Sequence, residues 1–202
     1  MANRSWHINA GLVTYIVTIL ILIAISFFDF TFQRDSPWLL VAFLMALFGA
    51  QFPDLDQMWK KIFGHRDWLL HSSIPSILMV ILVVNGSTEN KILYPILALF
   101  NLGVASHLML DYFPTWEGDH DKKLEFKDVV YATTWVFDGI TGSENVQKMV
   151  GTYLIHFPGW LKSFGLKRHT LTKIWTRVYL LVNALILIGI SVFLLFRFQQ
   201  LS

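Results

Sequence analysis

Four short stretches within the first 113 residues carry the histidine and aspartate side chains that could bind a metal. The candidate ligands are His7, Asp54 and Asp56 of a Pro-Asp-Leu-Asp sequence, His65 and His71 of Gly-His-Arg-Asp-Trp-Leu-Leu-His-Ser, and His107 and Asp111. Imidazole nitrogen and carboxylate oxygen bind zinc, manganese and iron, and the absence of cysteine excludes thiolate ligands and disulfides. These residue types predict a divalent-metal site, with zinc as the first choice and manganese or iron as alternatives.

The spacing within each stretch limits how its side chains can meet. His107 and Asp111 are four residues apart, so both would project from one face of a helix. Asp54 and Asp56 follow a proline, which suggests an extended or turning segment that offers both carboxylates to a common centre. Each pattern also has an ordinary interpretation: a chance pair on a helix, an interfacial histidine at His7, or an Asp-x-Asp helix cap.

The elements that must position these side chains are helices that cross a membrane. Hydrophobic residues make up 54% of the chain and charged residues only 15%, which is typical of integral membrane proteins. Apolar runs near the roughly 20 residues that a spanning helix needs predict five spans, at 8–28, 37–52, 68–84, 92–113 and 175–196. We therefore expect an all-α, polytopic membrane helical bundle of about five transmembrane helices, with the lipid bilayer as its surroundings.

The predicted spans divide the chain into three regions. Residues 1–115 form a four-span helical membrane domain with the metal site, residues 116–174 a cytoplasmic or interfacial loop, and residues 175–202 the fifth transmembrane helix. Within the loop, residues 152–169 mix aromatic and basic side chains. This mixture fits either a stretch lying on the inner leaflet or an amphipathic loop packed on the protein.

Basic residues orient the predicted bundle. With five spans, 13 of the 16 Lys and Arg residues fall on the side of the N-terminus, which the positive-inside rule places in the cytoplasm. We therefore expect a multi-pass protein of the inner (plasma) membrane with a cytoplasmic N-terminus. The four His and Asp stretches fall on that same side, where a bundle can bring them into one pocket. The net charge of +2 gives no reason to expect a nucleic-acid partner.

The order of these motifs resembles a known family. A histidine near the start, Pro-Asp-Leu-Asp, His-Arg-x-x-x-x-His-Ser and His-x-x-x-Asp, over about residues 7–113, are similar to the DUF457 family, described as LexA-binding, inner-membrane-associated, predicted metal-dependent hydrolases. The resemblance implies a helical membrane protein with a metal-dependent hydrolase site. It implies metal-site roles for His7, Asp54, Asp56, His65, His71, His107 and Asp111. It also implies supporting roles for Arg66 and Ser72.

Seven candidate ligands exceed the three protein ligands that one catalytic zinc usually takes. Two metals bridged by Asp54 or Asp56, or one metal with Asp–His pairs around it, are both compatible with the motifs. Asp54, Asp56 and Arg66 are the candidate catalytic residues. Arg66 would clamp an anionic substrate, or would only anchor the chain at the positive side. A site at the inner interface suggests an amphiphilic phosphoester, such as a phospholipid or polyprenyl phosphate, as substrate. A peptide and a soluble phosphoester are the alternatives left open.

Two other function classes remain open beside the hydrolase. A non-enzymatic membrane adaptor would bind a cytoplasmic protein partner through the basic loop and would need no metal. A transporter or ion channel would carry polar residues across the whole membrane. The predicted spans contain only scattered polar residues, which make a poor pathway: Thr14, Thr18, Ser26, Asn101 and Asn183. We therefore rank the hydrolase first, the adaptor second and the transporter third.

Overall fold

Helices account for nearly all of the chain that the computed structural model describes, namely residues 4–25, 32–59, 68–86, 91–112 and 173–201. They are α1 (Arg4–Ala24), α2 (Phe32–Gln51), the 3-10 helix η1 (Phe52–Trp59), α4 (Ile74–Gly86), α5 (Leu93–Tyr112) and α8 (Lys173–Leu201). These described ranges contain no β-strand. The prediction of an all-α helical bundle is confirmed. The predicted loop at 116–174 lies outside the described residues except for the first residues of α8.

Four of the five predicted spans are helices long and apolar enough to cross a membrane. They are His7–Ala24, Asp35–Leu55, Leu93–Tyr112 and Thr176–Leu201. The predicted span at 68–84 differs, because it begins with turns at 68–73 and continues as the 13-residue α4. At 1.5 Å per residue α4 is about 20 Å long, shorter than the roughly 30 Å hydrocarbon core of a bilayer.

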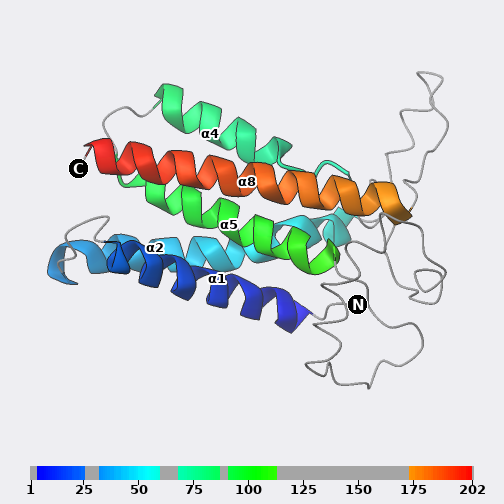
Figure 1. The fold of residues 1–202 in the computed structure, drawn as a ribbon, viewed down its shortest axis with the longest axis horizontal. Helices are drawn as coiled ribbons and strands as arrows, with labels where there is room; N and C mark the ends of the chain where they lie inside the picture. Colours follow the sequence, from blue (N-terminus) through cyan, green and yellow to red (C-terminus); the bar gives the residue numbers. More distant parts are fainter. Residues whose placement is uncertain (1–3, 26–31, 60–67, 87–90, 113–172, 202) are drawn as a thin grey trace.

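The helices run alternately up and down the bundle, so that one end collects parts of every segment. At this end α1, α4 and α8 begin, and α2 and α5 finish, as Figure 1 shows. Lys91 lies at the opposite end, where its Nζ donates to the carbonyl oxygen of Leu201 over 3.3 Å. One end of the bundle therefore holds three of the His and Asp stretches, together with His71 of the fourth. The topology of the predicted spans requires this arrangement.

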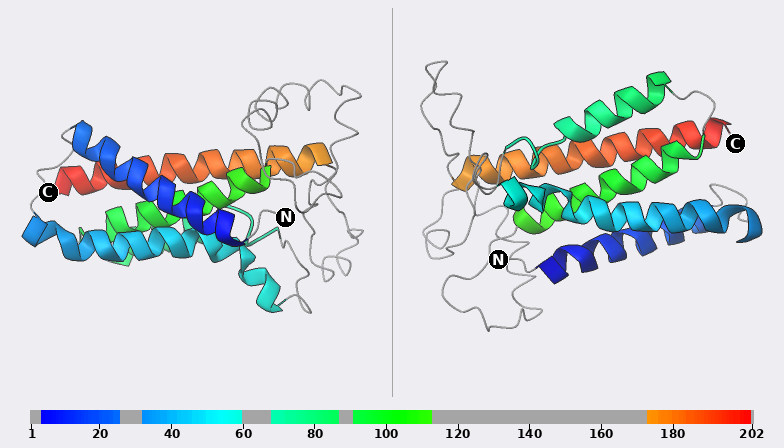
Figure 2. Two further views of the ribbon diagram at one scale, coloured as in Figure 1. Left: turned by 90° about the horizontal axis from the view of Figure 1, so that it is seen from below. Right: turned by 180° about the vertical axis from the view of Figure 1, so that it is seen from behind.

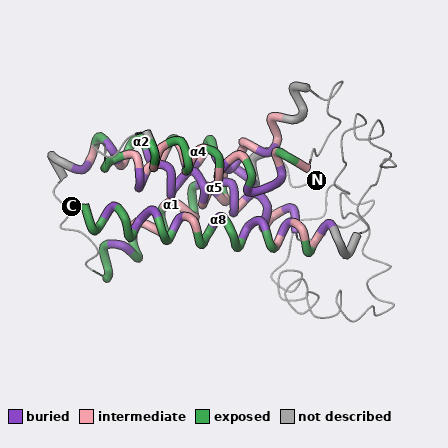
Figure 3. The backbone as a smooth tube through the Cα atoms, turned by 90° about the horizontal axis from the view of Figure 1, so that it is seen from above, coloured by how far each residue is buried: buried purple, intermediate pink, exposed green. Residues whose placement is uncertain are grey.

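Helix α5 is the central helix of the bundle and packs against α2, α8 and α1. In α5, 67% of the residues of the membrane span are buried, compared with 17% in α1. Buried positions follow the sides on which the helices face one another (Figure 3). Large apolar side chains such as Leu20, Leu82 and Phe196 point outward instead. An apolar exterior over a packed interior is what a bundle surrounded by acyl chains requires.

Small residues allow α1, α2 and α5 to approach one another closely. A Cβ atom added to Gly103 of α5 would overlap the backbone of Ala46 on α2, and one added to Gly11 of α1 would lie 2.7 Å from Cβ of Ala50. Figure 2 shows α1 crossing the pair formed by α2 and α5. Close backbone contact through Gly and Ala is a common way for membrane helices to associate. This contact brings the ends of three helices within side-chain reach.

Candidate metal centre

His107 lies near the end of α5 and is fully buried. Its Nδ1 lies 2.8 Å from the backbone carbonyl oxygen of Ala50 on α2. A carbonyl oxygen can only accept a hydrogen bond, so Nδ1 must carry the proton and donate it. The neutral ring then keeps its lone pair on Nε2, which makes no hydrogen bond with the residues that the structure describes. This is the tautomer of a histidine that binds metal through Nε2.

The carboxylate of Asp111 faces three imidazole rings from three parts of the chain. Its Oδ2 lies 3.4 Å from Nε2 of His107 and 3.8 Å from Nε2 of His71. Its Oδ1 lies 3.8 Å from Nε2 of His7. Each of these four residues exposes 7% of its surface or less. The predicted pairing of His107 and Asp111 on one face of a helix is therefore present, and histidines from α1 and from the turn before α4 join it.

These separations suit ligands arranged around a common ion. Two donor atoms each about 2.1 Å from a tetrahedral zinc lie about 3.4 Å apart. The nitrogen–oxygen distances from His107 and His71 to Asp111, 3.4 Å and 3.8 Å, are close to this value. Direct ion pairing of all three imidazoles would instead place three positive charges around one carboxylate in a buried site, which is unfavourable. His71, His107 and Asp111 can therefore hold a metal ion with nitrogen and oxygen ligands.

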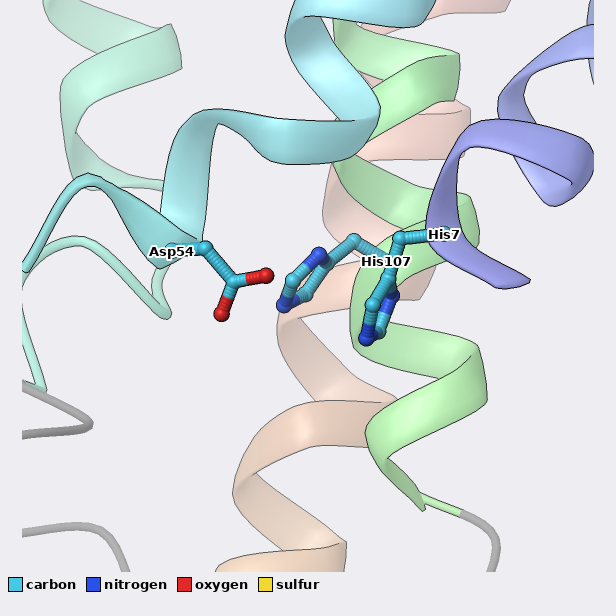
Figure 4. Close-up of side chains that lie close together, drawn as sticks. All are labelled: His7, Asp54 and His107. Atoms are coloured by element: carbon cyan, nitrogen blue, oxygen red, sulfur yellow. The ribbon is translucent and has the colours of Figure 1, made fainter. Parts of the chain in front are cut away.

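Asp54 reaches the same histidines from η1, the continuation of α2. Figure 4 shows its carboxylate directed toward the ring of His107, beside which the ring of His7 lies. The ligand atoms of His7, Asp54 and His107 lie within 4.8 Å of one another. The two imidazole rings stack with their centroids 3.9 Å apart and their planes at 19°. Asp54 is only partly buried, so it forms the more accessible side of the cluster.

The two groups of ligands share His107 and so are not independent sites. One group contains His7, Asp54 and His107, and the other contains His71, His107 and Asp111. Because Nδ1 of His107 is bonded to Ala50, this residue offers one lone pair, which can bind one ion only. The arrangement thus suits either a single ion or two adjacent ions of which only one contacts His107. We refer to these five residues as the His–Asp cluster.

The close packing of the helices explains why the two stacked rings meet. His7 precedes Gly11 by four residues on α1, and His107 follows Gly103 by four residues on α5. Since α1 and α5 run in opposite directions, each histidine lies one turn toward the same end from its glycine. Both glycines lie against Ala46 and Ala50 of α2, so this shared close contact with α2 brings the two rings together.

The structure brings together five of the seven predicted ligands. His65 and Arg66 lie outside the described residues, as does the side chain of Asp56. The segment that carries Asp54 and Asp56 is the 3-10 helix η1, which is the turning form of the two that were expected. The expectation that both carboxylates point to one centre stays a prediction for Asp56, and Asp54 alone is seen at the cluster.

Ser72 has a structural role in this part of the chain. Its hydroxyl donates to the carbonyl oxygen of Leu69 over 2.6 Å and accepts from the backbone N–H of Ile74 over 3.2 Å. These bonds close the turn that contains His71 and satisfy a donor at the start of α4.

Sequence reasoning did not find the groups that orient the ligands. The carbonyl oxygen of Ala50 carries no signal in the sequence, because every residue has one. Gly11 and Gly103 lie four residues from a histidine, which is a signal only once the two helices are known to cross. Asn183 is a polar residue in an apolar span, and this pattern alone indicates no contact with another part of the chain.

No protein-family model matches this chain, and no curated protein or solved structure matches it either. The resemblance to the DUF457 family therefore stays a prediction from the motifs. The cluster itself is established by the geometry of the described residues, whatever the family.

Proposed function

We propose that this protein is a membrane-bound, metal-dependent hydrolase whose site lies at the cytoplasmic face of the inner membrane. The observation that carries the proposal is the placement of three imidazole Nε2 atoms within 3.4–3.8 Å of the Asp111 carboxylate. Ionisable groups are costly inside a membrane protein unless they bind something or pair, so a buried set of this kind favours function. The distribution of Lys and Arg in the sequence supports the cytoplasmic location.

Zinc is the metal that this ligand set favours, with manganese and iron as alternatives. A divalent ion held there would supply Lewis-acid activation of water and of a phosphoryl oxygen. His71, His107 and Asp111 would bind it, and the buried carboxylate would offset part of its charge. Asp54, on the more accessible side, would accept a proton from a water molecule or bind a second ion. Arg66 would hold an anionic group of the substrate.

A lipid phosphoester is the substrate class that the surroundings favour. A groove of about 290 Å³ runs between α1 and α8 over the surface of α5. Its lining includes Ala10 of α1, Ser106 and Leu110 of α5, and Ile188 of α8. Ala10 lies three residues from His7, and Leu110 is next to Asp111. An apolar groove lined by residues next to the cluster in sequence is suited to an aliphatic chain, and the head group of such a lipid would lie toward the cluster.

Elemental analysis of detergent-purified protein tests the metal. We expect one or two equivalents of zinc, manganese or iron in the wild type, with loss of metal in His71→Ala and His107→Ala. Ser106→Ala is the matched control, since its hydroxyl bonds only to Gly103 of its own helix among the described contacts. Retention of full metal content in both histidine variants would refute the assignment of the cluster.

Hydrolysis of phosphatidic acid and of an isoprenyl phosphate, each in mixed micelles, tests the activity. Asp54→Asn should keep most of the metal and lose most of the phosphate release, because a group that accepts a proton is removed while the buried ligands stay. A wild type that binds no metal after reconstitution would instead favour the adaptor, which needs none. Metal uptake into vesicles without hydrolysis would favour the transporter.

A further inference from the structure

The segment that carries His71 is a series of turns, and it needs support from outside itself. Residues 68–73 form no regular helix and are followed directly by α4. Within the segment, the N–H of Ser72 donates to the carbonyl oxygen of Leu69 over 3.2 Å. Such local bonds shape the turn but do not place it relative to the rest of the bundle. A metal ligand must nevertheless be held within a fraction of an ångström of its working position.

Two side chains of α8, one helical turn apart, bond to this segment on either side of His71. The hydroxyl of Tyr179 donates to the carbonyl oxygen of Trp68 over 2.7 Å, three residues before His71. The Oδ1 of Asn183 accepts from the backbone N–H of Ser73 over 2.8 Å and from its hydroxyl over 2.9 Å. The segment is therefore attached to α8 at both of its ends.

Asn183 is itself held in one orientation by its own helix. Its Nδ2 donates to the carbonyl oxygen of Tyr179 over 2.8 Å, which assigns the amide oxygen to the bonds with Ser73. Asn183 is buried, so loss of its side chain would leave the N–H of Ser73 without this acceptor in apolar surroundings. Helix α8 carries no His, Asp or Glu, and so contributes none of the five cluster residues.

We propose that Tyr179 and Asn183 are positioning residues that hold His71 in the geometry of a metal ligand. This inference rests on the proposed metal site. Through these two side chains the position of α8 sets the distance of His71 from Asp111 and His107. Helix α8, which carries no ligand of its own, thereby determines whether His71 is in place to complete the cluster.

Cobalt(II) provides a direct readout, because its visible absorption reports the number and type of its ligands. The purified full-length chain would be loaded with cobalt, and its affinity measured by competition with a chelator. We expect Asn183→Ala to lower the affinity by about 10- to 100-fold and to change the spectrum in the same direction as His71→Ala. Tyr179→Phe, which removes one hydroxyl and keeps the ring, should give a smaller change of the same kind.

Ser191→Ala is the matched control, because Ser191 is a buried polar residue of α8 that bonds to the carbonyl oxygen of Ala98 on α5. It should leave the cobalt spectrum unchanged even if it lowers stability. In the double variant with His71→Ala, Asn183→Ala should cause no further loss of affinity, because its effect passes through His71. The inference would be overturned if Asn183→Ala and Tyr179→Phe left the spectrum and the affinity unchanged. It would also be overturned if the losses of cobalt affinity in Asn183→Ala and His71→Ala added fully in the double variant. Either result would leave the metal site itself standing. A wild type that binds no cobalt, zinc or manganese would overturn both.

Discussion

Buried carboxylates occur at both ends of the bundle, and their surroundings differ. At the end opposite the cluster, Asp35 accepts a hydrogen bond of 3.0 Å from Nε1 of Trp38, one turn along the same helix. It also lies in the first turn of α2, where the helix dipole favours a negative charge. At the cluster end, Asp111 faces histidines from α1, α5 and the turn before α4. Burial alone therefore does not identify a metal site, whereas convergence of several elements at ligand spacing does.

Asp111→Asn is the substitution that tests this comparison most strongly. It keeps the shape of the side chain and removes the charge that the three imidazoles surround. We expect the affinity for zinc to fall by more than about 100-fold, the upper end of the effect of changes around a metal's ligands. Competition with a chelator measures it.

Asp35→Asn is the counterpart at the other end of the bundle. The amide oxygen still accepts from Trp38, so we expect unchanged metal affinity. The comparison between the two ends would fail if both variants lost metal to the same extent, since the loss would then reflect general destabilisation.

Gly103→Ala tests whether close helix packing builds the cluster. The added methyl group would overlap the carbonyl oxygen of Ala46 and lie 2.9 Å from the backbone nitrogen of Ala50, so α2 and α5 must separate. We expect a loss of about 1–3 kcal/mol in the free energy of unfolding, as is typical of overpacking. Metal affinity should fall with it, because separation also lengthens the bond from His107 to Ala50.

Gly189→Ala provides the control for this substitution, because a methyl group there would meet nothing within 4 Å. Chemical denaturation in detergent and a metal titration measure both effects. Equal behaviour of the two glycine variants would show that helix contact at Gly103 does not position His107.

Trp38→Phe should have the smallest effect. It removes the hydrogen bond to Asp35 and keeps an aromatic ring near Phe198, whose ring centroid lies 5.8 Å away. We expect a loss of about 1 kcal/mol in stability, the usual contribution of one hydrogen bond, and no change in metal content. Tyr15→Phe, which removes the bond from the Tyr15 hydroxyl to the carbonyl oxygen of Leu39, should behave alike. A loss of metal in either variant would mean that the two ends are coupled.

Much of the cluster was predictable because membrane topology leaves few choices. An apolar run of about 20 residues has to cross, so successive runs alternate in direction and the ends of α1, α2 and α5 fall together. The four-residue spacing of His107 and Asp111 then places both on one face of α5. The short α4 was harder to foresee. Its apolar stretch is continuous with Trp68, but the turn bonds of Leu69 and Ser72 end regular helix before Ile74.

The sequence by itself determined the class of the molecule, the order of its helices, the shared end of the His and Asp stretches, and the nitrogen and oxygen character of the site. Only the tertiary structure decided which side chains meet, which nitrogen of His107 is available, and which helix supports His71. These depend on the rotation of each helix about its axis and on backbone contacts at Gly11, Gly103 and Ala50. Hydropathy does not reveal the rotation of a helix or its backbone contacts, because an apolar helix is equally apolar in every rotation about its axis. The neighbouring helices, by contrast, pack well against it in only one rotation.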